Sequence, residues 1–186
     1  VMSFNAEDFA ASGSINDVAD FVQSENVNVA VFQEIQPYDE NRLTSAFNSR
    51  NLQLQYSAHC TLNNKTYSSS DNNIFSDYIM VWSAFPVSSV SSIITGNVTD
   101  PVSGETFDTD NLRPVLRFRV NVNGQYLWFY GAHQKSMPDS TSQKKRRAQA
   151  SALRMYIQNN HNLSTDKIVI LGDMNTMGDG KNRDGG

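Results

Sequence analysis

Four apolar segments of the chain end in polar side chains that could bind a metal ion or move a proton. Asn5 follows VMSF, Glu34 follows VAVFQ, His133 follows WFYGA, and Asp173 and Asn175 follow IVILG. Catalytic groups gather at strand ends, because rigid strands position them and the loops beyond are open to solvent. Each residue alone has a structural explanation, such as a turn or a backbone contact. Four such strand ends in one chain favour a shared site.

The side-chain types in this set are hard oxygen ligands. Glu34 and Asp173 are carboxylates, which suit Mg²⁺ or Mn²⁺, and Asn5 and Asn175 are amides that can bond a phosphate oxygen or a metal-bound water without adding negative charge. Magnesium keeps several waters and is commonly held by one or two carboxylates together with a substrate phosphate. The pattern therefore predicts a Mg²⁺ or Mn²⁺ site.

His133 adds a group that can donate a proton or bond a developing oxyanion. Other chemistries are excluded by what the sequence lacks: Cys60 is the only cysteine, so no internal disulfide or multi-thiolate metal site can form. The sequence has no nucleophile elbow, phosphate-binding glycine loop or HExxH helix. Hydrolysis of a phosphate ester is the remaining interpretation.

The elements that must position these residues alternate strands with helices, which is typical of a layered α/β or α+β domain. One amphipathic helix is expected to begin at Ser14, and another is expected to bury Ala150, Leu153 and Ile157. Asn123-Gly124 favours a type I′ hairpin turn. The expected strands are 1–5, 27–33, 52–58, 77–82, 87–95, both sides of 123–124, and 167–173; the helices are 14–22, 39–47 and 142–159; the long loops are 59–76 and 96–111.

The length and composition indicate one globular domain. The chain has 186 residues, of which 39% are hydrophobic and 18% charged. No apolar run approaches the roughly 18 residues of a membrane span, so no stable membrane insertion is expected, and the opening VMSFNAEDF does not resemble a signal peptide. The many Asn and Ser residues, with only 6 Lys, favour an exported bacterial protein, secreted or periplasmic.

The charge is divided unevenly. The net charge is −4, yet nine basic residues and one acid, Asp139, lie between Arg113 and Arg154, so this segment carries +8 and the remainder −12. A basic segment can bind an anionic partner such as DNA or RNA, or it can simply be the solvated face of helices and strands. Both interpretations remain open on the sequence.

The order of the motifs resembles the endonuclease/exonuclease/phosphatase superfamily, which includes pancreatic-type deoxyribonucleases, sphingomyelinases and inositol-polyphosphate phosphatases. The resemblance implies a four-layered α/β-sandwich, in which two packed mixed β-sheets are flanked by helices, and metal-dependent hydrolysis of phosphoesters. The matching segments are SFNAE (3–7), FQEI (32–35), YIMVWSAFPV (78–87), LRPVLRF (112–118), GAHQKS (131–136) and ILGDMNT (170–176).

The same resemblance implies which residues would hold the metal. Glu34 matches the metal-ligand glutamate of the superfamily, and Asn5 matches its first-strand asparagine, near the metal and the phosphate. Glu7 lies where some members have an additional acidic ligand.

It also implies roles in the reaction. His133 is similar to the histidine that protonates the leaving group or binds the scissile phosphate, and Asp173 and Asn175 match the pair that orients the nucleophile and holds the phosphate. Arg113 resembles a phosphate-binding arginine of the deoxyribonuclease branch. Asp77 lies near the position of a carboxylate that pairs with the histidine.

One superfamily motif is missing. Members end with an aspartate and a Ser-Asp-His motif whose histidine is the general base, but the segment after Asn175, TMGDGKNRDGG, contains no histidine. His59 and His161 do not lie where they could replace it. Residues 1–186 are therefore expected to form a single domain that lacks its C-terminal strands, and this chain alone is expected to be weakly active or inactive.

Three functions follow from these observations. The first is a Mg²⁺-dependent nuclease that cleaves a nucleic-acid backbone, indicated by Arg113, His133 and the basic run from Lys144 to Arg147. The second is a phosphomonoesterase or a phospholipid phosphodiesterase of the sphingomyelinase or inositol-phosphatase type, since the same edge of the sheet could hydrolyse smaller substrates. The third is a degenerate, non-catalytic binding domain, indicated by the missing motif and the two long loops.

Overall fold

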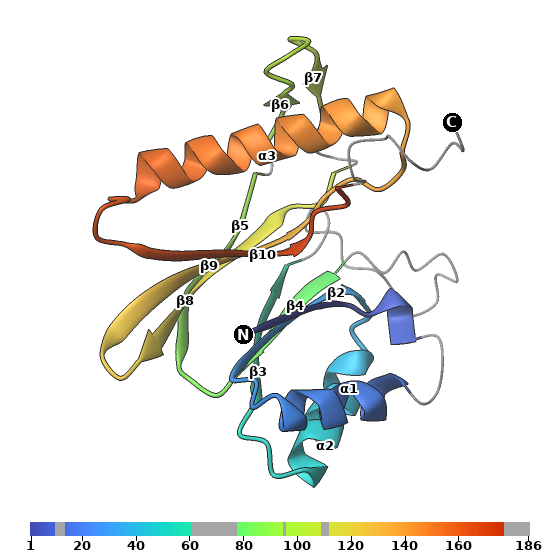
Figure 1. Ribbon diagram of the computed structural model, residues 1–186, viewed down its shortest axis with the longest axis vertical. Coiled ribbons are helices and arrows are strands. Elements are labelled where there is room, and N and C mark those ends of the chain that lie inside the picture. The colour runs from blue at the N-terminus through green and yellow to red at the C-terminus, as the bar shows by residue number, and fades with distance from the viewer. Residues whose placement is uncertain (10–13, 61–77, 95, 109–111, 177–186) are drawn as a thin grey trace.

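The computed structural model describes residues 1–9, 14–60, 78–94, 96–108 and 112–176. Two β-sheets lie face to face, and helices cover the outer side of each sheet (Figure 1). This arrangement confirms the predicted four-layered α/β-sandwich.

The first sheet contains the N-terminal strands in the order β1-β2-β4-β3. Strands β1 and β2 are parallel, and β2, β4 and β3 pair antiparallel, so the sheet is mixed. Helices α1 and α2 cover its outer face (Figure 1). The elements are β1 (Met2–Asn5), the 3-10 helix η1 (Glu7–Phe9), α1 (Ser14–Ser24), β2 (Val29–Ile35), α2 (Asp39–Ser49), β3 (Gln55–Cys60) and β4 (Tyr78–Ser83).

The second sheet has the order β10-β9-β8-β5 and is also mixed, because β10 is parallel to β9 while the other pairs are antiparallel. The long helix α3 covers its outer face, and a two-stranded sheet, β6 with β7, lies against α3 (Figure 1). The elements are β5 (Val87–Ile93), β6 (Val98–Thr99), β7 (Thr106–Phe107), β8 (Val115–Val122), β9 (Gln125–His133), α3 (Ser140–Asn160) and β10 (Lys167–Asp173).

Successive side chains of a strand point to opposite faces of its sheet, so each sheet presents apolar side chains to the layer on either side. In β2, Val29 and Val31 face the second sheet, where they pack with Phe118 and Phe129, while Phe32 faces the helices. The predicted face of α1 is confirmed: the buried residues are Ile15, Val18, Ala19 and Val22. Burial of such side chains stabilises the fold by about 1.5 to 3 kcal/mol each.

Some sequence predictions need correction. Ala150 is exposed, and Ala148 lies in the core in its place, together with Leu153 and Ile157. The segment predicted as the loop 96–111 contains β6 and β7. His59 lies in β3 and not in the predicted loop 59–76, and residues 61–76 of that loop fall outside the described residues. Short strands such as β6 are only two residues long, so they have no periodicity to detect.

The predicted hairpin turn is confirmed. Asn123 and Gly124 have φ values of +51° and +86° and connect β8 to β9. A type I′ turn requires positive φ at both central residues, and Asn and Gly tolerate it best. This turn fixes the register of β8 and β9 and hence the position of His133 at the end of β9.

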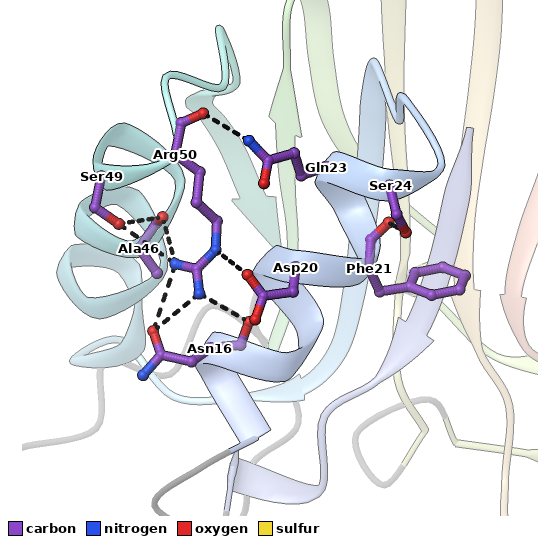
Figure 2. A network of polar contacts seen from close by, with 8 residues as sticks. All are labelled: Asn16, Asp20, Phe21, Gln23, Ser24, Ala46, Ser49 and Arg50. Atoms are coloured by element: carbon purple, nitrogen blue, oxygen red, sulfur yellow. Dashed lines mark hydrogen bonds and ion pairs between the residues drawn. The ribbon is translucent and has the colours of Figure 1, made fainter.

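Arg50 joins the two helices of the outer layer (Figure 2). From the end of α2 its guanidinium donates to Asp20 Oδ1 at 2.6 Å and to the Asn16 carbonyl at 3.2 Å, both on α1, and to the Ala46 carbonyl at 3.0 Å. The Ala46 carbonyl, near the end of α2, also accepts from Ser49 Oγ at 2.8 Å, so two side chains bind a carbonyl of the last helical turn. The network fixes α1 against α2 on the far side of the first sheet.

Asp100 holds the small β6–β7 sheet against α3. Its carboxylate is fully buried and accepts from Arg147 Nε at 3.0 Å and Nη2 at 2.7 Å, and from Ser103 Oγ at 2.7 Å. A bidentate guanidinium–carboxylate pair is among the stronger polar contacts in proteins. The Arg147 guanidinium keeps the pKa of Asp100 well below its usual range.

The Asp100 contact predicts a specific acid sensitivity. Because its pKa is lower in the folded than in the unfolded chain, Asp100 stabilises the fold above its unfolded pKa of about 3.9, and this contribution is lost as the pH falls toward the folded pKa. We expect Asp100→Asn to melt well below the wild type at pH 7, and the gap to narrow below about pH 4. Thermal melts from pH 7 to pH 2 measure this gap. A gap that stays constant with pH would contradict the assignment.

No helix in the described ranges is long and apolar enough to cross a membrane.

Candidate active site

The site lies where the edge strands of the two sheets meet. Strand β1 is an edge of the first sheet and β10 an edge of the second, and the two run side by side in the same direction (Figure 1). At their carboxyl ends, Asn5 Nδ2 donates to Asp173 Oδ2 at 3.0 Å. Because β1 is parallel to β2 and β10 to β9, the ends of all four strands lie at this edge. The four strand ends that the sequence analysis singled out are thus brought together.

Glu34 is placed by a β-bulge. Gln33 pairs with Ile79 and Ile35 pairs with Tyr78, so Glu34 is an extra residue in β2, and its φ is +50°. Without the bulge, strict alternation would direct Glu34 to the helix-facing side, where Phe32 lies in an apolar core. Bulges redirect side chains, and non-glycine residues with positive φ gather at functional sites. The sequence predicted that Glu34 follows the strand, whereas it lies within it.

Glu34 and His133 form the closest pair of ionisable side chains in the site. His133 Nε2 lies 3.2 Å from Glu34 Oε1, although neither imidazole nitrogen has a hydrogen-bond partner of good geometry within the described residues. The approach of His133 lowers the pKa of Glu34, partial burial opposes the shift, and the Asn5 amide and the charge of Arg113 lower it further. Glu34 is therefore ionised at neutral pH and available to a cation.

The burial of His133 limits what it can touch directly. Its side chain is 0% exposed, whereas that of Glu34 is 26% exposed. In this arrangement the imidazole lies behind the Glu34 carboxylate and is not open to solvent. Direct proton donation by His133 stays a prediction, and the contact seen in the structure is with Glu34.

Asp173 and Asn175 are connected to the segment after β9. The Asn175 backbone N–H donates to Asp173 Oδ1 at 2.8 Å, and Asn175 Nδ2 donates to the Gln134 carbonyl at 2.9 Å. The Gln134 N–H in turn donates to the Asp173 carbonyl at 2.9 Å. Asn175 adopts φ +47°, a conformation that Asn tolerates better than most residues. These contacts fix both side chains beside Asn5.

Arg113 reaches the same carbonyl. Its Nη1 donates to Gln134 O at 3.2 Å, and its charge is near enough to Glu34 to lower the pKa of that carboxyl. Gln134 was part of a matching motif but had no predicted role. Gln134 acts through its backbone carbonyl, and the type of its side chain does not indicate such a role.

The two remaining predicted residues are not brought into this cluster. Glu7 is exposed at the start of η1, and its contact with the site is made by its backbone N–H, which donates to Asn5 Oδ1 at 3.1 Å. Asp77 lies outside the described residues. The other histidines have structural partners: His59 contacts Tyr56, and His161 contacts Asp166 at 2.8 Å.

The donor set fits a hard divalent cation. An ionised, partly exposed Glu34 next to the Asn5 amide is a combination that Mg²⁺ or Mn²⁺ accepts when water and a phosphate supply the other ligands. In the described part of the chain, no three His, Cys, Asp or Glu side chains gather closely enough to form a complete metal cage.

The basic run of α3 is engaged in contacts within the chain. Its four cationic side chains bind acids, carbonyls or an aromatic ring belonging to nearby segments, and this removes much of the evidence for a nucleic-acid surface. Lys144 pairs with Glu105 at 2.8 Å, Lys145 lies 5.8 Å from the Phe107 ring centre, Arg146 donates to the carbonyls of Lys135 and Met137 at 2.9 and 2.7 Å, and Arg147 binds Asp100.

Comparison with protein families matches residues 2–184 to the Endonuclease/Exonuclease/phosphatase family. The chain belongs to this family. The match covers nearly the whole sequence and includes every residue of the site just described. It confirms the superfamily resemblance that the motif order indicated. Comparison with curated protein sequences gave no significant match.

Solved structures share the fold at low sequence identity. A β-hairpin deletion mutant of beta toxin from Staphylococcus aureus is 16% identical, with a TM-score of 0.59, and the match covers 94% of this chain and 66% of that one. A family protein from Leptotrichia buccalis is 14% identical (TM-score 0.62; 94% and 66%), and sphingomyelinase C from Streptomyces griseocarneus is 14% identical (TM-score 0.56; 93% and 63%). The chain thus spans slightly less than two thirds of the length of these proteins.

Proposed function

We propose that the protein is a divalent-metal-dependent phosphoester hydrolase that uses Mg²⁺ or Mn²⁺. The observation that carries this proposal is the bulge in β2, which places an ionised Glu34 beside Asn5 and opposite Asp173 at the junction of the two sheets. Family membership supports the same reaction class. A cation held by Glu34 and Asn5 would polarise the phosphoryl group and stabilise its developing negative charge.

The side chains of the chain divide the remaining work. Arg113, whose Nη1 donates to the Gln134 carbonyl, contributes a positive charge beside the site that would attract a substrate phosphate. Asp173 has one carboxylate oxygen bonded to Asn5 and the other to the Asn175 backbone, and a carboxylate fixed in this way would orient an attacking water. His133 holds Glu34 in its ionised form from behind. This assignment makes His133 a positioning residue.

A nucleic-acid phosphodiester is the first candidate substrate, because Arg113 lies at the site and the segment from Arg113 to Arg154 is strongly basic. A smaller phosphoester or a phospholipid headgroup is the second, and one observation favours it: the basic side chains of α3 are engaged by Asp100, Glu105 and backbone carbonyls. Lys144 and Arg147 each pair with a carboxylate, which lowers the net charge that α3 offers to a polyanion. One fold neighbour is a sphingomyelinase.

A substrate screen tests the proposal. Plasmid DNA, a chromogenic phosphomonoester and sphingomyelin vesicles would each be incubated with the protein in Mg²⁺, with EDTA controls. We expect turnover of at least one substrate, and we expect EDTA to abolish it. Nuclease activity should fall steeply with salt. Mg²⁺ binding without turnover on any substrate would favour a non-catalytic domain.

A further inference from the structure

Two buried side chains of α3 contact the segment that follows His133. We propose that Gln149, assisted by Arg146, is a positioning residue for Arg113 and Asn175, a role that rests on the proposed function. Neither residue lies at the strand ends that form the site. Both are buried, at 5% and 8% exposure, on the side of α3 that faces the second sheet.

Gln149 connects two segments through its single amide. Its Oε1 accepts the Lys135 N–H at 3.0 Å, and its Nε2 donates to the Arg113 carbonyl at 3.4 Å. Lys135 is two residues after His133, and Arg113 precedes β8. One side chain thus sets the distance between the backbone that carries Arg113 and the backbone that leaves β9.

Arg146 lies one turn earlier on α3 and holds the same segment from its other side. Its Nη1 donates to the Lys135 carbonyl at 2.9 Å and to the Met137 carbonyl at 2.7 Å. Met137 has φ +85°, a conformation that a methionine rarely adopts without support from its surroundings. Together Gln149 and Arg146 bind both the N–H and the carbonyl of Lys135.

Arg113 and Asn175 are oriented by the peptide group that joins Gln134 to Lys135. The Gln134 carbonyl belongs to the same rigid peptide unit as the Lys135 N–H, which Gln149 binds. That carbonyl accepts from Arg113 Nη1 at 3.2 Å and from Asn175 Nδ2 at 2.9 Å. A rotation of this peptide plane would therefore move the acceptor that orients both side chains. Gln149 controls that rotation, because it holds the opposite edge of the plane.

A purely structural role would also explain a buried amide, since buried polar groups need partners. The two interpretations differ in what they predict for Asn175, whose side chain is linked to Gln149 only through the peptide plane. A structural role lowers the stability of the fold and leaves the Asn175 amide environment unchanged. A positioning role changes that environment in a folded protein.

The experiment compares Gln149→Leu, Gln149→Glu and, as a matched control, Gln158→Leu, which makes the same change at an exposed position of α3. Nuclear magnetic resonance would follow the side-chain amide of Asn175 and the guanidinium Nε–H of Arg113. We expect Gln149→Leu to shift both signals and the control to shift neither. Gln149→Glu keeps an acceptor for the Lys135 N–H but loses the donor to the Arg113 carbonyl. In this variant the Asn175 signal should therefore stay at its wild-type position, and the Arg113 signal should shift.

A folded Gln149→Leu whose Asn175 amide signal does not shift, even if its melting temperature falls, would overturn the proposal. A turnover assay tests the proposed function separately from the positioning role of Gln149. If the wild type turns over a substrate in the screen, Gln149→Leu should lower kcat by about tenfold or more with KM nearly unchanged, since misplaced groups cost transition-state stabilisation. If no variant or wild type turns over substrate while the amide shifts occur, the proposed function fails and the positioning of Arg113 and Asn175 by Gln149 stands.

Discussion

Replacement of Glu34 by glutamine is expected to weaken Mg²⁺ or Mn²⁺ binding by more than about 100-fold and to abolish metal-dependent turnover. Partners that only orient a metal ligand are already worth 10- to 100-fold in affinity, so loss of the ligand charge itself should cost more. Glu34 is the ionised, partly exposed carboxylate of the site, held by Asn5 and backed by His133. Glutamine has nearly the same shape, so the bulge and the surrounding contacts should persist. Isothermal titration calorimetry with each metal measures the change directly.

The control for this experiment is a carboxylate far from the site. Glu25→Gln removes one negative charge from an exposed position just after α1 and should bind metal as the wild type does. In the absence of metal, the wild type and Glu25→Gln should melt at similar temperatures. Glu34→Gln should stay folded but melt lower, because the lowered pKa of Glu34 means that its ionised form stabilises the fold. Equal metal affinity in all three proteins would remove Glu34 from the metal site and with it the main support for the proposed function.

Replacement of Gly172 by alanine is expected to destabilise the fold by about 4 kcal/mol or more, a cost that few single substitutions reach. A Cβ atom at this position would lie 1.8 Å from the Ala132 carbonyl oxygen of the neighbouring strand β9, and the backbone φ of +135° is one that alanine rarely adopts. The clash is with backbone, so no side-chain rotation relieves it. Strand β10 would have to separate from β9 next to Asp173 and His133, which pair across these strands.

Thermal and denaturant unfolding measure this effect, and Gly96→Ala is the matched control. A Cβ at Gly96 would meet no heavy atom within 4 Å, so this substitution should change stability by less than about 0.5 kcal/mol. Wild-type stability in Gly172→Ala would show that β10 does not lie against β9 as described. The sequence offered a turn as one explanation of Gly172-Asp173, whereas the structure shows close strand contact.

Most elements could be predicted because apolar periodicity reflects burial on one face. The α1 stripe, the β8–β9 hairpin and the strand before Asp173 are long enough for their periods to be distinguished. Ala150 was assigned to the wrong face because its spacing from Leu153 also fits a helical period. Ala148 is the buried alanine because it packs against Val98 and Phe107 of the β6–β7 sheet. Elements as short as β6 and β7 are stabilised by tertiary contacts with α3 and have no local pattern.

The sequence by itself determined the family, the layered α/β architecture and the polar residues that end the apolar strands, because residue type, order and local period are enough for these. Only the tertiary structure decided how the residues are used. The bulge at Glu34 depends on pairing with β4, and the Gln134 carbonyl is a backbone group whose partners, Arg113 and Asn175, lie on two other segments. The same holds for charge. In the folded chain, the basic run of α3 contacts Asp100, Glu105 and the carbonyls after β9. Such contacts form between residues that are far apart in the chain, and the composition does not indicate which of these residues lie close together in the fold.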